Sequence, residues 1–182
     1  MTLLVDLCFK KDSLSRYEFV EPIRKAVSRE HECTVIHRSE LSAEILAGAD
    51  RVILCGTALK DNGYMEELDR FQLLKGLGVP ILGICAGMQV LSMLYGGNVY
   101  KWTSIGLHNI DILYESFLLG GLRTMEGYHL HNYGAEAPIN FRLIAVDGQH
   151  TLAFESRDEK IYGILFHPEV RNLWVIENFL AI

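Results

Sequence analysis

Short apolar runs alternate with helical patterns through the first half of the chain, and this alternation restricts the possible folds most. Four runs have the length of a buried strand: Thr2–Leu7, Cys33–His37, Arg51–Cys55 and Val79–Ile84. Apolar residues at helical spacing follow each run, and a helix expected over Met88–Tyr95 ends at Gly96 and Gly97. Strands that alternate with helices form a parallel sheet covered on both faces. The pattern therefore predicts a flavodoxin-like, doubly wound α/β fold with a mostly parallel sheet.

The second half of the chain has a different pattern. Shorter runs with alternating polarity predict a short antiparallel extension of the sheet before a final strand: Ile110–Tyr114, Gly127–Leu130, Arg142–Ala145, Thr151–Glu155 and Ile161–Phe166. A helix is expected over Leu173–Leu180. Because no linker rich in proline or serine and no repeat interrupts the chain, we expect one domain over residues 1–182.

Composition excludes several classes of protein. Hydrophobic residues make up 49% of the 182 residues and charged residues 22%, which is typical of a globular chain. The net charge of −6, without any basic run, argues against nucleic acid or an anionic membrane as the principal partner. No apolar stretch approaches the ~20 residues of a membrane helix, and the cysteines lack metal or disulfide spacing. We expect a cytoplasmic protein.

The segment Gly83–Gln89 contains the first candidate for a reactive residue. It passes from an apolar strand directly into a helix, and Cys85 has a glycine two positions before it and another two positions after it. A nucleophile elbow requires small residues at these positions because its turn is sharp and strained. The helix N-terminus behind Cys85 favours the reactive thiolate. The alternative interpretation is a cysteine that only packs in the core at a strand end.

A second candidate follows the apolar strand Ile161–Phe166. His167 and Glu169 flank Pro168, and residues two apart in an extended segment project to the same side, so Glu169 can orient His167. A cysteine nucleophile requires such a base. The motif alone also fits a surface turn. Because active sites of parallel α/β sheets assemble at the carboxyl ends of strands, we expect Cys85, His167 and Glu169 to form a catalytic triad.

These two motifs resemble those of the class I, triad-type glutamine amidotransferases. Gly-Ile-Cys-Ala-Gly-Met-Gln is similar to their Gly-x-Cys-x-Gly-x-Gln elbow, and Phe-His-Pro-Glu at residues 166–169 matches their second signature. The resemblance implies that Cys85 attacks the side-chain amide of L-glutamine, forms a thioester and releases ammonia. His167 then protonates the ammonia and activates water, with Glu169 orienting it. No nucleotide-binding glycine motif occurs, and we expect no cofactor and no metal.

The resemblance also implies further site residues. The oxyanion requires backbone N–H donors, which we expect from Ala86 and from the loop at Gly56 or Thr57, where the family has Ser-Gly-Gly-Pro. Gln89 resembles a residue that holds substrate glutamine, although a helical glutamine without a role is the alternative. His131 resembles a residue near the glutamine α-carboxylate. A metal site at His129 and His131 is disfavoured because no third ligand lies within reach in the sequence.

The resemblance further implies a partner. The chain ends just after the helix expected over Leu173–Leu180, so we expect a separate synthase subunit to accept the ammonia. The spacing is most similar to the glutaminase of GMP synthase. Glutaminases of anthranilate, aminodeoxychorismate and imidazole-glycerol-phosphate systems remain alternatives. So do a γ-glutamyl hydrolase on the same scaffold and a subunit that only binds partners.

Overall fold

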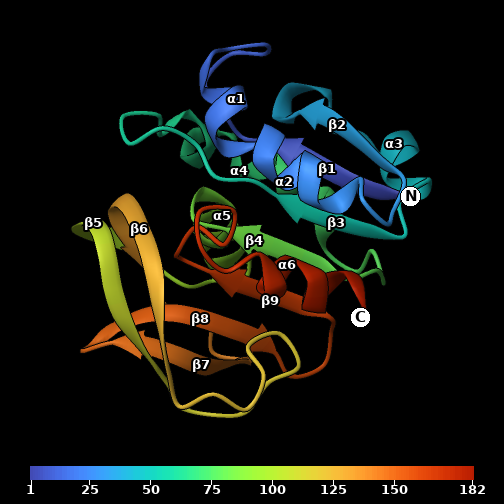
Figure 1. Ribbon diagram of the computed structural model, residues 1–182. Coiled ribbons are helices and arrows are strands. Elements are labelled where there is room, and N and C mark those ends of the chain that lie inside the picture. The colour runs from blue at the N-terminus through green and yellow to red at the C-terminus, as the bar shows by residue number, and fades with distance from the viewer.

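Nine β-strands form one mixed sheet in the computed structural model, which describes residues 1–182 (Figure 1). In chain order they are β1 (Thr2–Asp6), β2 (Cys33–His37), β3 (Arg51–Leu54), β4 (Ile81–Ile84), β5 (Val99–Ile112), β6 (Thr124–Ala135), β7 (Phe141–Asp147), β8 (His150–Ser156) and β9 (Ile161–Ile164). Their order across the sheet is β2-β1-β3-β4-β9-β8-β7-β5-β6. The expectation of an α/β fold is confirmed.

The parallel part of the sheet consists of β2, β1, β3, β4 and β9. Its first four strands in the chain lie where the apolar runs predicted them. The fifth, β9, comes from the far end of the chain and pairs with β4, with Gly83 opposite Gly163. Because the two strands are parallel, their carboxyl ends meet at one edge of the sheet. Cys85 and His167, which follow these two ends, are thereby brought to the same edge.

The antiparallel part is larger than the short extension that the sequence predicted. β5 has 14 residues and β6 has 12, and the two form a long hairpin that curls away from the parallel strands (Figure 1). The expectation missed most of β5 because this strand is largely solvated, with Ile105 and Leu107 exposed next to polar neighbours. Given this curled sheet, the flavodoxin-like, doubly wound description of the fold stays a prediction.

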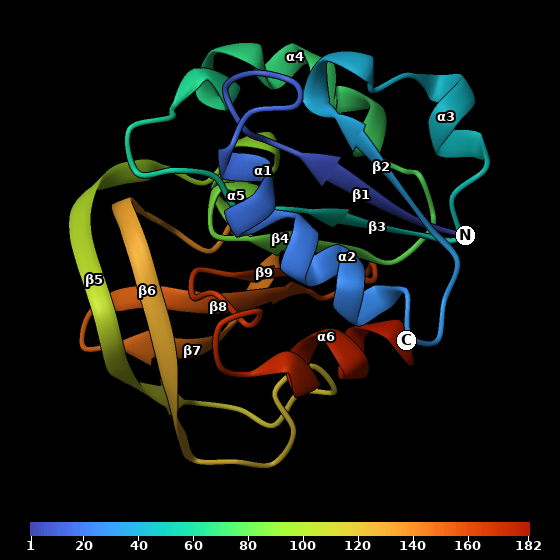
Figure 2. The ribbon, with the colours of Figure 1, turned by 45° about the horizontal axis from the view of Figure 1, so that its top comes forward.

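Six short α-helices accompany the sheet: α1 (Ser15–Phe19), α2 (Glu21–Val27), α3 (Ala43–Ala47), α4 (Leu68–Phe71), α5 (Ala86–Leu94) and α6 (Leu173–Leu180). α2 packs against α6, whereas α5 packs against α4 and lies along β3, β4 and β9 (Figure 2). The longest helix has nine residues, and none could span a membrane.

One expected helix is replaced by shorter turns. Apolar residues at Met65, Leu68, Phe71, Leu74 and Leu77 predicted a continuous helix, but α4 covers only four residues between two 3₁₀ turns. The reason lies in the spacing itself, because these residues recur every three positions. Three residues per turn is the period of a 3₁₀-helix, whereas an α-helix has 3.6.

Close backbone contacts hold the junction between β4 and α5. A Cβ atom on Gly83 would lie 2.5 Å from the Gly87 carbonyl group, and one on Gly87 would lie 2.2 Å from the backbone oxygen of Leu54. Side-chain atoms never approach backbone this closely, so only glycine fits at both positions. The two glycines therefore let α5 begin directly against β3 and β4, and this fixes the position of Cys85.

We predict that Gly87→Ala lowers the free energy of unfolding by about 3 kcal/mol, because the new methyl group pushes α5 away from Leu54. Denaturant unfolding followed by circular dichroism measures the change. Gly48→Ala is the matched control, because Gly48 has a φ of −91° and a Cβ there would meet no atom closer than 3.7 Å. Equal stability of the two variants would contradict the prediction.

Candidate active site

Cys85 occupies the turn between β4 and α5 in a strained conformation. Its φ is 51° and its ψ −103°, and Asp12 is the only other non-glycine residue with positive φ. Such a backbone costs of order 1–3 kcal/mol and is typical of functional sites. The thiol donates a hydrogen bond to the backbone oxygen of Leu130 at 3.7 Å, and the residue is 4% exposed. The turn therefore directs Cys85 toward β6.

His167 and Glu169 form a buried pair just beyond β9. Nδ1 of His167 lies 2.7 Å from Oε1 of Glu169, and both side chains are almost inaccessible to solvent. The backbone N–H of His167 donates to the oxygen of Tyr128 at 2.8 Å, which fixes the segment to β6. Nε2 of His167 has no hydrogen-bond partner and remains able to donate or accept a proton.

Two opposing effects act on the pKa of His167. Burial lowers it, but electrostatic interaction and hydrogen bonding with Cys85 and Glu169 raise it, and the pKa lies well above the ordinary value for histidine. The pair therefore favours an imidazolium next to Cys85. The Cys85 thiol is directed to the backbone oxygen of Leu130, and it lies close enough to His167 to contribute to the raised pKa of the imidazole.

The loop after β3 approaches this pair from the other side. A Cβ atom on Gly56 would lie 2.8 Å from Cε1 of His167, so this position requires glycine. Thr57 is buried, and its hydroxyl donates to Oδ2 of Asp61 at 2.7 Å. The backbone N–H groups of Gly56, Thr57 and Ala86 make no hydrogen bond within the protein, so all three remain available as donors.

Gln89 and His131 line a small cavity together with Cys85. The Gln89 amide accepts a hydrogen bond from the Tyr64 hydroxyl and donates one to the backbone oxygen of Tyr133 at 2.8 Å. Nδ1 of His131 lies 3.2 Å from the backbone oxygen of Trp102, and its Nε2 is buried without a partner. The cavity also contacts Thr57 and Ala86, whereas His167 and Glu169 line a neighbouring cavity of about 260 Å³.

Three residues of this region were not expected from the sequence. Tyr64 and Asn132 line the same cavity as Cys85, and Asp61 organises the loop beside it. Cys85 and His167 were found because each closely follows the end of a predicted strand. Tyr64 and Asp61 lie several residues beyond the nearest strand end, so this signal was missing for them. Asn132 directly follows His131, and this adjacency was the one indication that the sequence offered.

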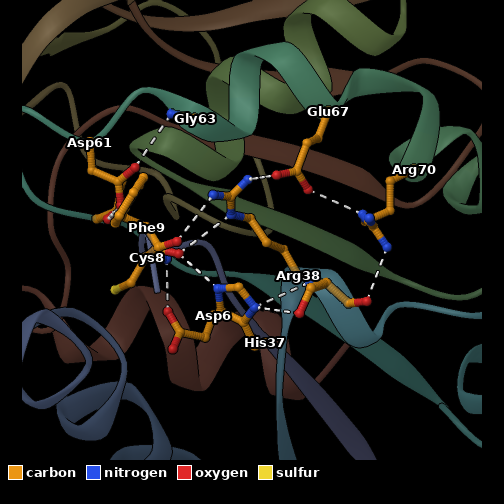
Figure 3. Close-up of polar contacts among 11 residues, drawn as sticks. Asp6, Cys8, Phe9, His37, Arg38, Asp61, Gly63, Glu67 and Arg70 are labelled. Atoms are coloured by element: carbon orange, nitrogen blue, oxygen red, sulfur yellow. Dashed lines mark hydrogen bonds and ion pairs between the residues drawn. The ribbon is translucent and has the colours of Figure 1, made fainter. Parts of the chain in front are cut away.

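A further polar network fixes the loops that border the site (Figure 3). Arg38 is buried and pairs with Glu67 at 2.5 Å between Nη1 and Oε1. Its other nitrogens donate to the backbone oxygens of Cys8 at 3.4 Å and Phe9 at 3.5 Å. This buried guanidinium connects three segments of the chain, and loss of Glu67 would leave its charge buried without an ionic partner.

A cluster of histidines lies where a metal was disfavoured. His129 is joined by His108 and Asp147, whose possible ligand atoms lie within 4.8 Å of one another. The rings of His108 and His129, however, are stacked with centroids 4.6 Å apart and planes inclined by 8°. Nitrogen lone pairs lie in the ring plane, so in this stack they run parallel and do not converge on one ion. The arrangement does not fit a metal.

A cysteine on a strand-to-helix turn, next to a buried His–Glu pair at the edge of parallel strands, defines the nucleophile-elbow class of α/β proteins. The glutamine amidotransferase class-I family matches residues 18–173. The chain belongs to this family.

Three related sequences belong to GMP synthases. One subunit of the glutamine-hydrolysing GMP synthase of Sulfolobus acidocaldarius is 32% identical over 78% of this chain and 80% of its own length. The corresponding subunit of Saccharolobus solfataricus is 31% identical over 76% of this chain and 79% of its own length. The GMP synthase of Limosilactobacillus reuteri is 41% identical over 53% of this chain and only 20% of its own length.

Solved structures share the fold. A crystal structure from Thermoplasma acidophilum, assigned provisionally to one subunit of a GMP synthase, matches with a TM-score of 0.84 over 99% of this chain and 92% of its own, at 21% identity. A glutamine amidotransferase from Thermotoga maritima matches with a TM-score of 0.71 over 99% of this chain and 80% of its own, at 17% identity. Both crystal structures therefore share the α/β fold of this chain.

Burial affects the pKa of two histidines near the site. It lowers the pKa of His129 to about 3 and that of His131 to about 4, and for His129 the neighbouring imidazoles act in the same direction. In the unfolded chain the pKa of both is about 6.5. Below that pH the unfolded chain binds protons that the folded chain does not bind, so stability falls as the pH falls.

We predict that the free energy of unfolding decreases from pH 6.5 to about pH 4, by up to about 1.4 kcal/mol per pH unit for each of these histidines. His129→Gln is expected to reduce this slope. Denaturant unfolding at several pH values measures it, and His31→Gln, outside the cluster, is the control. A slope in His129→Gln as steep as that of the wild type would contradict the prediction.

Proposed function

We propose that this chain is the glutamine-hydrolysing subunit of a GMP synthase and that it supplies ammonia to a separate synthase subunit. The observation that carries the proposal is the strained Cys85 turn at the same sheet edge as the buried pair of His167 and Glu169. The two archaeal GMP synthase subunits that match over about four-fifths of their length support it, with 80% and 79% of their residues covered.

In the first half of the reaction, the Cys85 thiolate attacks the side-chain amide carbon of glutamine. The carbonyl π-electrons move onto oxygen, and the N–H groups of Ala86 and of Gly56 or Thr57 stabilise the resulting oxyanion, since all three are free to donate. When the tetrahedral intermediate collapses, the C–N bond breaks and Nε2–H of His167 protonates the departing nitrogen. Ammonia leaves, and a γ-glutamyl thioester remains on Cys85.

In the second half, water takes the place of ammonia. Nε2 of His167, now neutral, removes a proton from water, and the hydroxide attacks the thioester carbon. Collapse of this second intermediate breaks the C–S bond, which releases glutamate and regenerates the thiolate. Glu169 holds the ring by its Nδ1 throughout and stabilises the imidazolium each time it forms.

Recognition of glutamine is assigned to the cavity beside Cys85. Nε2 of His131 carries a free lone pair or proton there, and its Nδ1 is held by the backbone oxygen of Trp102. The Gln89 amide offers one acceptor and one donor to the α-amino and α-carboxylate groups of the substrate. Both residues are buried, so their hydrogen bonds to substrate would form away from competing water.

Replacement of the nucleophile tests the activity directly. We predict that Cys85→Ala lowers glutamine hydrolysis by at least about 10⁴-fold, because the thioester cannot form, and that the circular dichroism spectrum stays unchanged. Release of glutamate and of ammonia measures the activity. Cys33→Ala, a cysteine outside the site, is the matched control and is expected to retain full activity. Hydrolysis by Cys85→Ala at the wild-type rate would overturn the assignment.

A second prediction concerns the synthase partner. We predict that the isolated chain hydrolyses glutamine slowly. The synthase subunit of GMP synthase, together with its substrates, is expected to raise the turnover by about 10²–10³-fold, because loss of one oxyanion donor typically lowers turnover by that factor. The physical reason is Thr57, whose β-branched side chain and hydrogen bond to Asp61 restrict the loop that would donate this N–H. Equal turnover with and without the partner would contradict this prediction.

Variants of Thr57 separate the proposed cause from the partner effect. Thr57→Gly is expected to raise the basal turnover and to reduce the stimulation, because glycine allows the peptide to rotate. Thr57→Ser keeps the hydroxyl group that donates to Asp61 and is the matched control. If Thr57→Gly behaves as the wild type, this loop does not control the activity.

A further inference from the structure

The cavity beside Cys85 is too small for the substrate of the proposed reaction. Its volume is about 10 Å³, roughly the space of one water molecule. Glutamine is several times larger than water, and its side-chain amide must reach the Cys85 sulfur. Some part of the cavity wall must therefore move before glutamine binds.

One side of the cavity wall is the segment from Thr57 to Tyr64, which we call the pocket loop. Two contacts connect it across the cavity to the rest of the protein. The Tyr64 hydroxyl donates to Oε1 of Gln89 on α5, and Nδ2 of Asn132 on β6 donates to the backbone oxygen of Leu59 at 2.8 Å. Both contacts join neutral groups.

The remaining hydrogen bonds of the pocket loop lie within it or at its far end. Asp61 accepts a hydrogen bond from the Thr57 hydroxyl at 2.7 Å. It also accepts one from the Gly63 N–H at 3.4 Å (Figure 3), and together the two bonds keep the turn in one shape. Beyond the loop, Glu67 pairs with the buried Arg38. These contacts need not break when the cavity widens. The contacts of Tyr64 and Asn132 must break.

We infer that Tyr64 and Asn132 are positioning residues that hold the pocket loop closed over Cys85, and that glutamine binds when both contacts open. The identity of the ligand rests on the proposed function. Opening exposes Oε1 of Gln89, the acceptor that Tyr64 now occupies, so a substrate ammonium group can replace the tyrosine hydroxyl there. The same amide thus stabilises the closed state through Tyr64 and the open state through the ligand.

Alkylation of Cys85 tests this inference without any assumption about the reaction. The probes are iodoacetamide, which is small, and a glutamine-sized chloromethyl ketone, both followed by mass spectrometry. Loss of one neutral hydrogen bond is expected to increase the labelling rate with the larger probe by about 3- to 10-fold in Tyr64→Phe and in Asn132→Ala. Tyr114→Phe, which changes an exposed tyrosine, is the matched control.

The ratio of the two rates separates opening from a change in thiol reactivity. A more reactive thiolate accelerates both probes equally, whereas opening accelerates the larger probe more. A ratio that rises in both variants supports the inference. A ratio that is unchanged or lower in either variant overturns it.

Glutamine kinetics then distinguish failure of this inference from failure of the proposed function. If Tyr64→Phe opens the loop, KM for glutamine falls by a similar 3- to 10-fold and kcat stays within about twofold. Altered labelling without any glutamine hydrolysis supports the closed loop and overturns the proposed function. Hydrolysis with unaltered labelling and unaltered KM overturns the closed loop alone.

Discussion

The pairing of β4 with β9 is the contact on which the site depends. It joins segments about eighty residues apart, from Ile81 paired with Ile161 to Ile84 paired with Ile164, and the N–H of Cys85 extends it by donating to Ile164. Neither strand carries the whole site, because Cys85 follows one and His167 the other. The chemistry therefore exists only once the parallel sheet is complete, and a shift of register by one residue would turn one of these side chains to the opposite face.

Two of the groups gathered at this edge reduce the stability of the fold. Cys85 has a strained backbone, and burial lowers the pKa of His129 to about 3, so the fold loses stability when the pH falls below the ordinary pKa of histidine. Each of these costs free energy that the hydrophobic core must offset. The glycine contacts between β3, β4 and α5 provide a rigid support beneath them, which explains why the strain at Cys85 persists.

Patterns within short stretches of the sequence predicted the strands of the parallel sheet and the turns that carry Cys85 and His167. The strand-to-helix change at Cys85 and the strand before His167 are visible in the sequence, because a buried strand and its turn have characteristic residues. Most of the long strand β5, before Ile110, was not predicted, since a solvated hairpin needs little alternation. Tyr64 and Arg38 were missed for another reason: their roles come from partners that lie far away in the sequence and become neighbours only in the folded chain.

Thr57 links access to the cavity with the chemistry of the proposed reaction. Its hydroxyl is bonded to Asp61 inside the pocket loop, and its peptide follows Gly56, which packs directly against the ring of His167. The pocket loop therefore begins at the peptide between Gly56 and Thr57, the candidate oxyanion donor. Because one short segment both borders the cavity beside Cys85 and carries the candidate donor, the inferred opening of the loop and the alignment of the donor involve the same stretch of backbone.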